Sequence, residues 1–311
     1  MLPAVTAAAT PPTAPVGDLP ESPAAAAEGE VLQDRADRPV VRIGDVVRHP
    51  RQPWSASVHA LLGHLAEAGF PEAPRPGPLV VDGPQGEWDD VGYIEGVSGD
   101  DACLLVSTDE AVAEVAQLLR RYHDVVAGWR PAVPPVWFDG QVGAGDGGEH
   151  LVCHGDVGPW NLVWRDERVV GLIDWEFATI GTRRTDIAYA LHYLVPFRDR
   201  SYWADVLGMP RKPRRRHRMA VFAEAYGIPV DDQLVDDVLA SQQAGVDLMR
   251  DLAEQGRPRQ QQLVADGELD REHRAVLWGQ GHRHKFQAKR DRGRRPRPPR
   301  DGRDPHPDGL R

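Results

Sequence analysis

Three polar side chains at a fixed spacing carry the chemistry that this sequence is expected to perform. Asp156 is followed five residues later by Asn161, and Asp174 stands thirteen residues beyond that amide. Oxygen ligands of this kind suit Mg²⁺, a hard cation that prefers few protein ligands together with water and phosphate oxygens. An Asp-x-x-x-x-Asn loop followed by a metal-binding Asp is also the arrangement with which kinases position phosphoryl groups. The spacing therefore indicates phosphoryl transfer.

Two short apolar runs must bring these side chains together. Residues 161–164 and 169–173 are rich in β-forming residues and flank a polar turn, which is typical of a β-hairpin. If the residues on either side of the turn pair with each other, antiparallel register sets Asn161 opposite Leu172. Asp174 then emerges within a residue or two of the amide. The hairpin is predicted to deliver an amide and a carboxylate to one place.

These motifs resemble the signature of the aminoglycoside phosphotransferase and choline kinase-like family. The strongest similarity is His-Gly-Asp-x-x-x-x-Asn at 154–161 with Ile-Asp-Trp-Glu at 173–176, and it continues into Thr-Asp-Ile-Ala at 185–188. Weaker similarity extends to 40–53 and to 93–96. Linked motifs constrain structural context as well as residue identity, so chance agreement is a poor explanation.

The resemblance implies an α+β, bilobal protein-kinase-like fold with a reduced strand-rich N-terminal lobe and a mostly helical C-terminal lobe. We expect a small nucleotide-binding lobe at 39–97 and a helical catalytic and substrate lobe at 98–284. Disordered tails are expected at 1–38 and 285–311, because segments so poor in large apolar residues cannot bury enough surface to offset the ordering of the chain.

Local patterns predict several elements of these lobes. A two-residue hairpin is expected within 40–48, a helix at 55–68, and a strand at 91–94. Ser107 with Glu110 forms a predicted capping box that opens the next helix. A later helix is expected over 233–250, and its core candidates are Leu234, Val238 and Leu248.

The resemblance assigns a role to each polar residue of the motif. Asp156 would accept the proton of a substrate hydroxyl, or hold that hydroxyl in line with the phosphate of ATP. Asn161 and Asp174 would coordinate Mg²⁺ that bridges the ATP phosphates. Glu176 could add a ligand to the same ion, and the alternative is a loop salt bridge with Arg183 or Arg184. ATP and Mg²⁺ are therefore the expected phosphate donor and cofactor.

Two neighbouring residues are expected to act structurally. His154 is predicted to bond loop carbonyl groups and so fix the catalytic loop, since a histidine in a turn is usually an orienting or surface residue. Asp186 is predicted to be a helix cap and a brace for the same loop.

The N-terminal lobe departs from the usual kinase pattern. All three lysines follow the catalytic motif, and the segment before the first predicted strand is not glycine-rich, although kinases use a strand lysine and a glycine-rich loop to hold phosphates. Arg48 is the better candidate for a phosphate contact and Arg42 the weaker one. The nucleotide is expected to be held mainly by the hinge backbone near Ile94, Glu95 and Val97, with the metal and Arg48 supplying further contacts.

Composition narrows the class of protein only modestly. The 311 residues carry a formal net charge of −10 at pH 7 and two cysteines, which are too few for a disulfide framework or a cysteine metal cluster. No apolar run approaches the ~18–20 residues of a membrane span, and the N-terminus lacks the features of a secretion signal. We expect a cytoplasmic protein without a membrane partner.

The phosphate acceptor is left open by the sequence. The partners of the protein are expected to be a nucleotide and a small hydroxyl-bearing molecule. The acidic body favours a cationic acceptor, whereas the basic patch at 211–218 favours an anionic one. Nucleic acid is not expected as a partner, because no aromatic residue interrupts the arginine-rich run of the C-terminal tail as a base-stacking segment would need.

Three functions remain at this point, of which a nucleic-acid-associated protein that uses the arginine-rich tail ranks far below the other two. The first is an ATP- and Mg²⁺-dependent phosphotransferase that acts on a hydroxyl of a small molecule. The alternative is a degenerate kinase-fold protein that binds a nucleotide or metabolite with little or no turnover, which the missing lysine and glycine-rich loop would explain.

Overall fold

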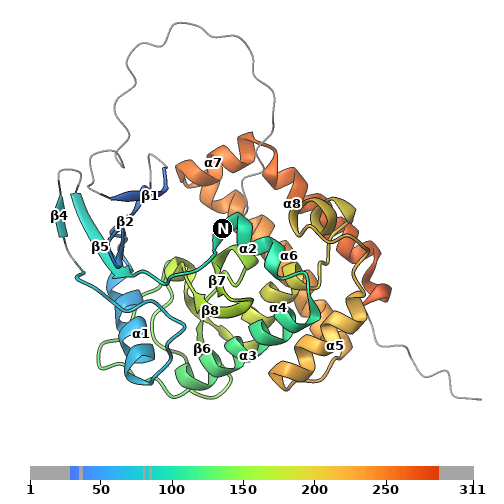
Figure 1. Cartoon of the computed structure of the whole chain (residues 1–311), viewed down its shortest axis with the longest axis horizontal. Helices are drawn as coiled ribbons and strands as arrows, with labels where there is room; N and C mark the ends of the chain where they lie inside the picture. The colour runs from blue at the N-terminus through green and yellow to red at the C-terminus, as the bar shows by residue number, and fades with distance from the viewer. Residues whose placement is uncertain (1–28, 35–37, 80, 84–85, 287–311) are drawn as a thin grey trace, which may run out of the picture.

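The chain forms a small sheet lobe beside a larger, mostly helical lobe (Figure 1). The structure is a computed structural model, and it describes residues 29–34, 38–79, 81–83 and 86–286. This architecture confirms the predicted α+β class with a strand-rich N-terminal part and a helical C-terminal part. In the described residues no helix is both long and apolar enough to cross a membrane.

The small lobe is a five-stranded antiparallel sheet in the order β1-β2-β3-β5-β4. The strands are β1 (Glu30–Gln33), β2 (Val40–Ile43), β3 (Val46–Pro50), β4 (Val81–Gly83) and β5 (Gly86–Gly92). Strand β1 lies inside the segment 1–38, which the sequence assigned to a disordered tail, and it pairs with β2. The predicted boundary of that tail was therefore wrong. The strand expected at 91–94 instead ends at Gly92, because the chain leaves the sheet there to become the hinge.

The predicted turn and helix of the small lobe are present. Ile43 pairs with Val46 across Gly44 and Asp45, and Gly44 has the positive φ of 61° that such a two-residue turn requires. Helix α1 (Ser55–Glu67) follows β3 and buries Leu61, Leu62 and Leu65. It ends before Gly69, whose φ of +75° is typical of a glycine that terminates a helix.

The large lobe packs its helices around two short two-stranded ladders. These ladders are β6 (His150–Cys153) with β9 (Thr179–Thr182), and β7 (Leu162–Arg165) with β8 (Arg168–Leu172). The helices are α2 (Ala102–Leu105), α3 (Asp109–Val126), α4 (Arg183–Leu194), α5 (Arg215–Tyr226), α6 (Asp232–Glu254), α7 (Pro258–Ala265) and α8 (Glu268–Gly281).

Two expectations for the helices need correction. Helix α3 is capped by Thr108, whose Oγ1 accepts the Ala111 amide at 3.1 Å, rather than by a box between Ser107 and Glu110. On α6, Leu234 and Val238 are buried as predicted, but the Leu248 side chain is 37% exposed. Leu248 faces a cavity instead of the core.

The two predicted tails lie largely outside the described residues.

Candidate functional site

A β-hairpin carries two of the three motif residues to one place, as predicted. Trp164 pairs with Val169 and Leu162 with Leu172, with a bulge between Val163 and Trp164. The bulge shifts the expected register by one residue, so that the Ile173 amide donates to the carbonyl of Asn161 at 2.9 Å. Asp174 leaves the hairpin directly after this bond, with a left-handed backbone at φ 64° and ψ 67°.

Asp156 is held by hydrogen bonds to both of its carboxylate oxygens. Asn161 Nδ2 donates to Asp156 Oδ2 at 2.9 Å and to the Asp156 carbonyl at 2.8 Å. The Tyr189 hydroxyl donates to Asp156 Oδ1 at 2.5 Å. Asp156 and Asn161 are both buried, yet Asp156 lines a cavity. A carboxylate oriented in this way can receive a proton from a bound hydroxyl.

Sequence reasoning missed Tyr189. It lies on α4 one helical turn beyond Asp186, and residues three apart share a helix face. That spacing was the available signal, since it places both side chains toward the catalytic loop. Burial raises the pKa of the Tyr189 hydroxyl well above its usual range, and the Asp156 carboxylate raises it further. Tyr189 is therefore a hydrogen-bond donor to Asp156 over the ordinary pH range.

Asp186 braces the catalytic loop, as predicted. Its Oδ2 accepts the His154 amide at 2.8 Å and its Oδ1 accepts the Gly155 amide at 2.9 Å. His123 of α3 contacts Oδ2 through Nε2 at 3.1 Å. Burial alone would raise the pKa of Asp186, but these partners hold it below its usual value. Asp186 is not the helix cap that was predicted, because Thr182 caps α4 in a capping box.

His154 orients the loop through both ring nitrogens. Its Nε2 lies 3.0 Å from the Ile173 carbonyl, and its Nδ1 accepts the Asp156 amide at 3.2 Å. These partners require a neutral ring with the proton on Nε2. Burial lowers the pKa of His154, although nearby carboxylates oppose the shift. The histidine links the Asp156 loop to the hairpin, which confirms its predicted structural role.

The loop also depends on Gly155. Its φ is +81°, and a Cβ at this position would lie 2.2 Å from the carbonyl oxygen of Phe177. Any other residue would push the loop away from the segment after Asp174. The His-Gly-Asp order is therefore set by backbone geometry as well as by chemistry.

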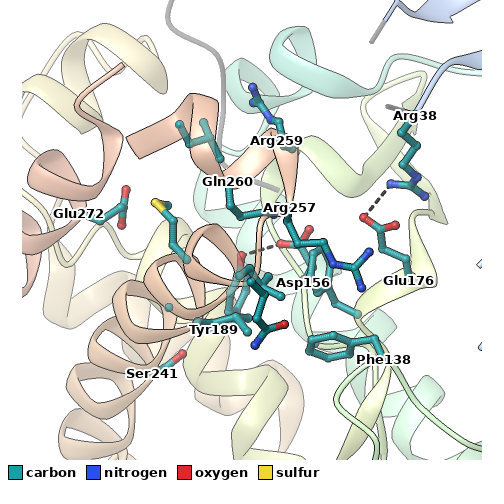
Figure 2. A pocket seen from close by; sticks show the side chains of 18 of the residues that line it. Arg38, Phe138, Asp156, Glu176, Tyr189, Ser241, Arg257, Arg259, Gln260 and Glu272 are labelled. Carbon is teal, nitrogen blue, oxygen red and sulfur yellow. Dashed lines mark hydrogen bonds and ion pairs between the residues drawn. The ribbon is translucent and has the colours of Figure 1, made fainter. Parts of the chain in front are cut away.

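Arg38 joins the two acidic residues that follow the hairpin. Its guanidinium lies 2.7 Å from Glu176 Oε1 and 3.4 Å from Asp174 Oδ1, and the Arg38–Glu176 pair is drawn in Figure 2. Burial raises the pKa of Asp174, but Arg38 lowers it together with the weaker effects of His154 and His49, so that the net shift is downward. Arg38 directly precedes Pro39 and β2. The sequence placed it in the tail and did not predict this contact.

The donor atoms fit a magnesium ion with few protein ligands. Asn161 commits its Nδ2 group to Asp156, which leaves the amide oxygen as its acceptor for a cation. Asp174 and Glu176 supply carboxylates that already share one cationic partner. Among the described residues no three His, Cys, Asp or Glu side chains gather as a metal site. Mg²⁺ here would therefore rely on the amide, water and phosphate oxygens for its remaining ligands.

The position of Arg48 contradicts its predicted role as a phosphate contact. Its guanidinium forms two bonds to Asp90 on β5, at 2.7 and 2.8 Å. Successive side chains of a strand point to opposite faces, and His49 therefore takes the other face of β3. Burial and the nearby charge of Arg38 lower the pKa of His49 to about 4. The structure brings His49 and Arg38, rather than Arg48, to the Asp174 side of the sheet.

The hinge is only partly available to a ligand. The backbone amide and carbonyl of Val97 both bond to Trp164, each at 2.8 Å. Both backbone groups of Val97 are therefore already paired within the chain, and its contact with a nucleotide stays a prediction. Ile94 and Glu95 remain between this bridge and Tyr93, whose amide donates to the Asp45 carbonyl at 2.8 Å. They lie where the chain passes from the sheet lobe to the helical lobe.

A cavity of about 290 Å³ opens beside Asp156. Figure 2 shows Arg38, Glu176 and Phe138 on one side of Asp156, and Ser241 and Glu272 on the other. The α6–α7 segment crosses the cavity and carries Arg257, Arg259 and Gln260. This size lies near the lower limit of typical small-molecule sites. A small molecule in this cavity would contact the carboxylate that the sequence singled out.

Comparisons of sequence point to one enzyme family. The profile described as "Phosphotransferase enzyme family" matches residues 126–222, the span that holds the catalytic loop, the hairpin and α4. A trifolitoxin immunity protein from Rhizobium leguminosarum bv. trifolii is 34% identical over 194 residues. That alignment covers 61% of this chain and 70% of the relative.

Solved structures share the fold at low sequence identity. Amicoumacin kinase in complex with AMP-PNP, Ca²⁺ and Ami matches with a TM-score of 0.54 and 12% identity, over 86% of this chain and 90% of that one. The GDP complex of aminoglycoside 2'-phosphotransferase-IIIa matches with a TM-score of 0.52 and 13% identity, over 82% and 93%. These likenesses confirm the predicted kinase-like fold.

Proposed function

Because this chain belongs to the phosphotransferase enzyme family, we propose that it transfers the γ-phosphate of ATP to a hydroxyl group of a small molecule in a Mg²⁺-dependent reaction. The observation that carries this proposal is the buried Asp156–Asn161 pair, which opens onto a cavity. A cytoplasmic location follows from the proposed use of ATP.

The proposed reaction exchanges one phosphorus–oxygen bond for another. The acceptor oxygen forms a bond to the γ-phosphorus as the bond from phosphorus to the bridging oxygen of ADP breaks. The hydroxyl proton passes to Asp156, whose orientation Asn161 and Tyr189 maintain. The bonds from Asp186 to the loop amides keep that carboxylate from moving as charge develops.

The metal would be held by Asn161, Asp174 and Glu176. A bound Mg²⁺ would supply charge neutralisation for the phosphate oxygens. We propose that Arg38 then turns from the two carboxylates toward phosphate, since a guanidinium forms bidentate bonds with either group. Ile94 and Glu95 are proposed to contact the nucleotide base.

The proposal can be tested with the full chain, ATP and Mg²⁺. Release of ADP is measured against a panel of hydroxyl acceptors, and mass spectrometry identifies the phosphorylated product. Asp156→Asn should lower turnover by ~10²–10⁴-fold, the usual range for loss of a general base. Asp166→Asn is the matched control, because it makes the same chemical change in the β7–β8 turn. Equal turnover in these two variants would remove Asp156 from the mechanism.

A second candidate function is binding without turnover. His49 occupies the strand face toward Asp174 where a kinase carries lysine, and Arg38 occupies the acidic pair. The immunity named for the Rhizobium relative supports protection against a toxin as the purpose of such binding. A ligand that raises the thermal stability of the chain, while no acceptor receives phosphate, would favour this candidate.

A further inference from the structure

The charges of the cavity beside Asp156 differ from those of the chain as a whole. The full chain is acidic, with a formal net charge of −10. The carboxylates that line the cavity are nevertheless engaged by named partners. Glu176 pairs with Arg38, and Glu272 accepts two bonds from Arg198 at 2.7 and 2.5 Å. The third is Asp156, which receives bonds from Asn161 and Tyr189 and serves the reaction itself.

Two arginines of the cavity lining, unlike these carboxylates, have no charged partner among the described residues. Among the residues that the structure describes, neither Arg257 nor Arg259 takes part in an ion pair, and the buried Nε of Arg259 has no hydrogen-bond partner. Figure 2 shows Arg257 directed toward the side of the cavity that holds Asp156 and Phe138, with Arg259 at the rim. The guanidinium of Arg257 lies 5.8 Å from the centre of the Trp54 ring. The lining therefore offers two guanidinium groups that have no ion-pair partner among the described residues.

The walls of the cavity are largely apolar. One wall is aromatic, because Phe138 makes edge contacts with Trp54 at 6.4 Å and with Phe177 at 5.1 Å between ring centres. Another part of the wall is aliphatic and comes from α6, where Leu248 and Met249 line the same space. Both walls lie next to the arginines of the α6–α7 segment. A ligand would meet apolar surface and a guanidinium together.

These features disfavour a polycationic acceptor. Each ammonium group brought into the cavity would lose water and would need a carboxylate in exchange, but the lining carboxylates are already committed. An anionic group would instead gain charge-assisted hydrogen bonds from Arg257 or Arg259. The local charge of a site outweighs the net charge of the chain at contact distance, because salt screens the more distant charges.

We propose that the phosphate acceptor is a hydroxyl-bearing molecule with an apolar body and a carboxylate group. This inference rests on the proposed phosphotransferase function and specifies its substrate class. The hydroxyl would meet Asp156, the apolar body would lie between the aromatic wall and α6, and the carboxylate would meet the arginines of the α6–α7 segment. Arg257 and Arg259 would then determine specificity.

The test uses acceptors that differ in one group. The probes are ω-hydroxyalkanoates of increasing chain length, their methyl esters, the matching ω-amino alcohols, and kanamycin as a polycation. Binding is measured by calorimetry, and phosphate transfer by product mass with ATP and Mg²⁺. A carboxylate of suitable length should bind at least about tenfold more tightly than its ester or amine, the ratio expected for a hydrogen bond to a charged group.

Substitutions of the two arginines test whether they cause the preference for a carboxylate. Arg257→Gln with Arg259→Gln should remove the preference for the carboxylate while leaving the ester unaffected. Arg250→Gln is the matched control, because that arginine lies on α6 outside the cavity and pairs with Asp247. It should keep the full preference.

The outcomes separate the inference from the function on which it rests. Transfer to kanamycin or the amino alcohols, without a carboxylate preference, would overturn the inference and leave the phosphotransferase proposal standing. Tight carboxylate binding that the arginine variants abolish, without transfer to any probe, would support the ligand class and contradict the proposed reaction. Equal binding of acid, ester and amine would overturn the inference whether or not phosphate is transferred.

Discussion

Replacing Arg38 by glutamine should make the stability of this protein depend on Mg²⁺ far more strongly than it does in the native chain. Arg38 holds Asp174 and Glu176 together, and all three side chains are less than one-fifth exposed. Glutamine retains a polar side chain but removes the positive charge. Two neighbouring carboxylates then remain in a poorly solvated place without their cation, so the variant should be destabilised when no metal is present.

The size of the effect follows from these contacts. Removing one partner of a fully buried ion pair costs ~3–5 kcal/mol, because a charge is left unpaired. The residual exposure of this cluster reduces the cost to about 1–3 kcal/mol. Mg²⁺ no longer has to displace a guanidinium in the variant, so its binding should strengthen by the same free energy, or ~5–150-fold in Kd. With Mg²⁺ in excess, the metal restores the stability that the substitution removed.

The measurement is urea unfolding followed by tryptophan fluorescence, in EDTA and in excess Mg²⁺. The gap between native chain and Arg38→Gln should be about 1–3 kcal/mol in EDTA and should close with the metal. Arg51→Gln is a matched control, because it breaks an arginine–carboxylate pair with Glu87 on the exposed side of the sheet. A gap for Arg38→Gln that Mg²⁺ leaves unchanged, as in the control, would refute the metal assignment.

Three further predictions concern single side chains. Arg48→Gln should lower the free energy of unfolding by about 1 kcal/mol, and the affinity for ATP, measured by calorimetry, should be unchanged. A large loss of ATP affinity would show that Arg48 contacts phosphate after all. Tyr189→Phe should lower kcat by about tenfold, because it removes a hydrogen bond to the charged Asp156; full activity would show that the bond is dispensable. Burial, with Arg198 nearby, lowers the pKa of His192 well below its usual value of 6.5, so the unfolded chain binds a proton there that the folded chain refuses. Stability should therefore be full above pH 6.5 and decline below it, and His192→Gln should reduce that slope by up to ~1.4 kcal/mol per pH unit.

The catalytic loop and hairpin could be predicted because their signals are local. Asp156 and Asn161 lie on one loop, and the strands that follow are read from β-forming residues bounded by a polar turn. The one-residue register shift could not be predicted, since a bulge such as that between Val163 and Trp164 depends on packing rather than on composition. The effect of this shift on the site is small, because Asn161 remains paired with Ile173, the residue before Asp174.

The contacts that were missed join distant parts of the chain. Arg38 and Asp174 are 136 residues apart, and no local pattern links them. Arg48 was favoured as a phosphate contact because it ends the predicted hairpin and because arginine recognises phosphate well. Strand alternation allows only one of Arg48 and His49 to face the cleft. The choice depends on the pairing of Arg48 with Asp90 across β3 and β5, which a single sequence does not reveal.

The separation between the loop anchors and the cavity walls makes this protein a convenient scaffold for directed evolution. The described bonds that anchor the His154–Asp156 loop come mainly from α4 and the hairpin. Much of the cavity wall instead comes from α6, α7 and the turn between them. A library restricted to the cavity-facing positions of these two helices can therefore vary the acceptor without disturbing the group that accepts the proton.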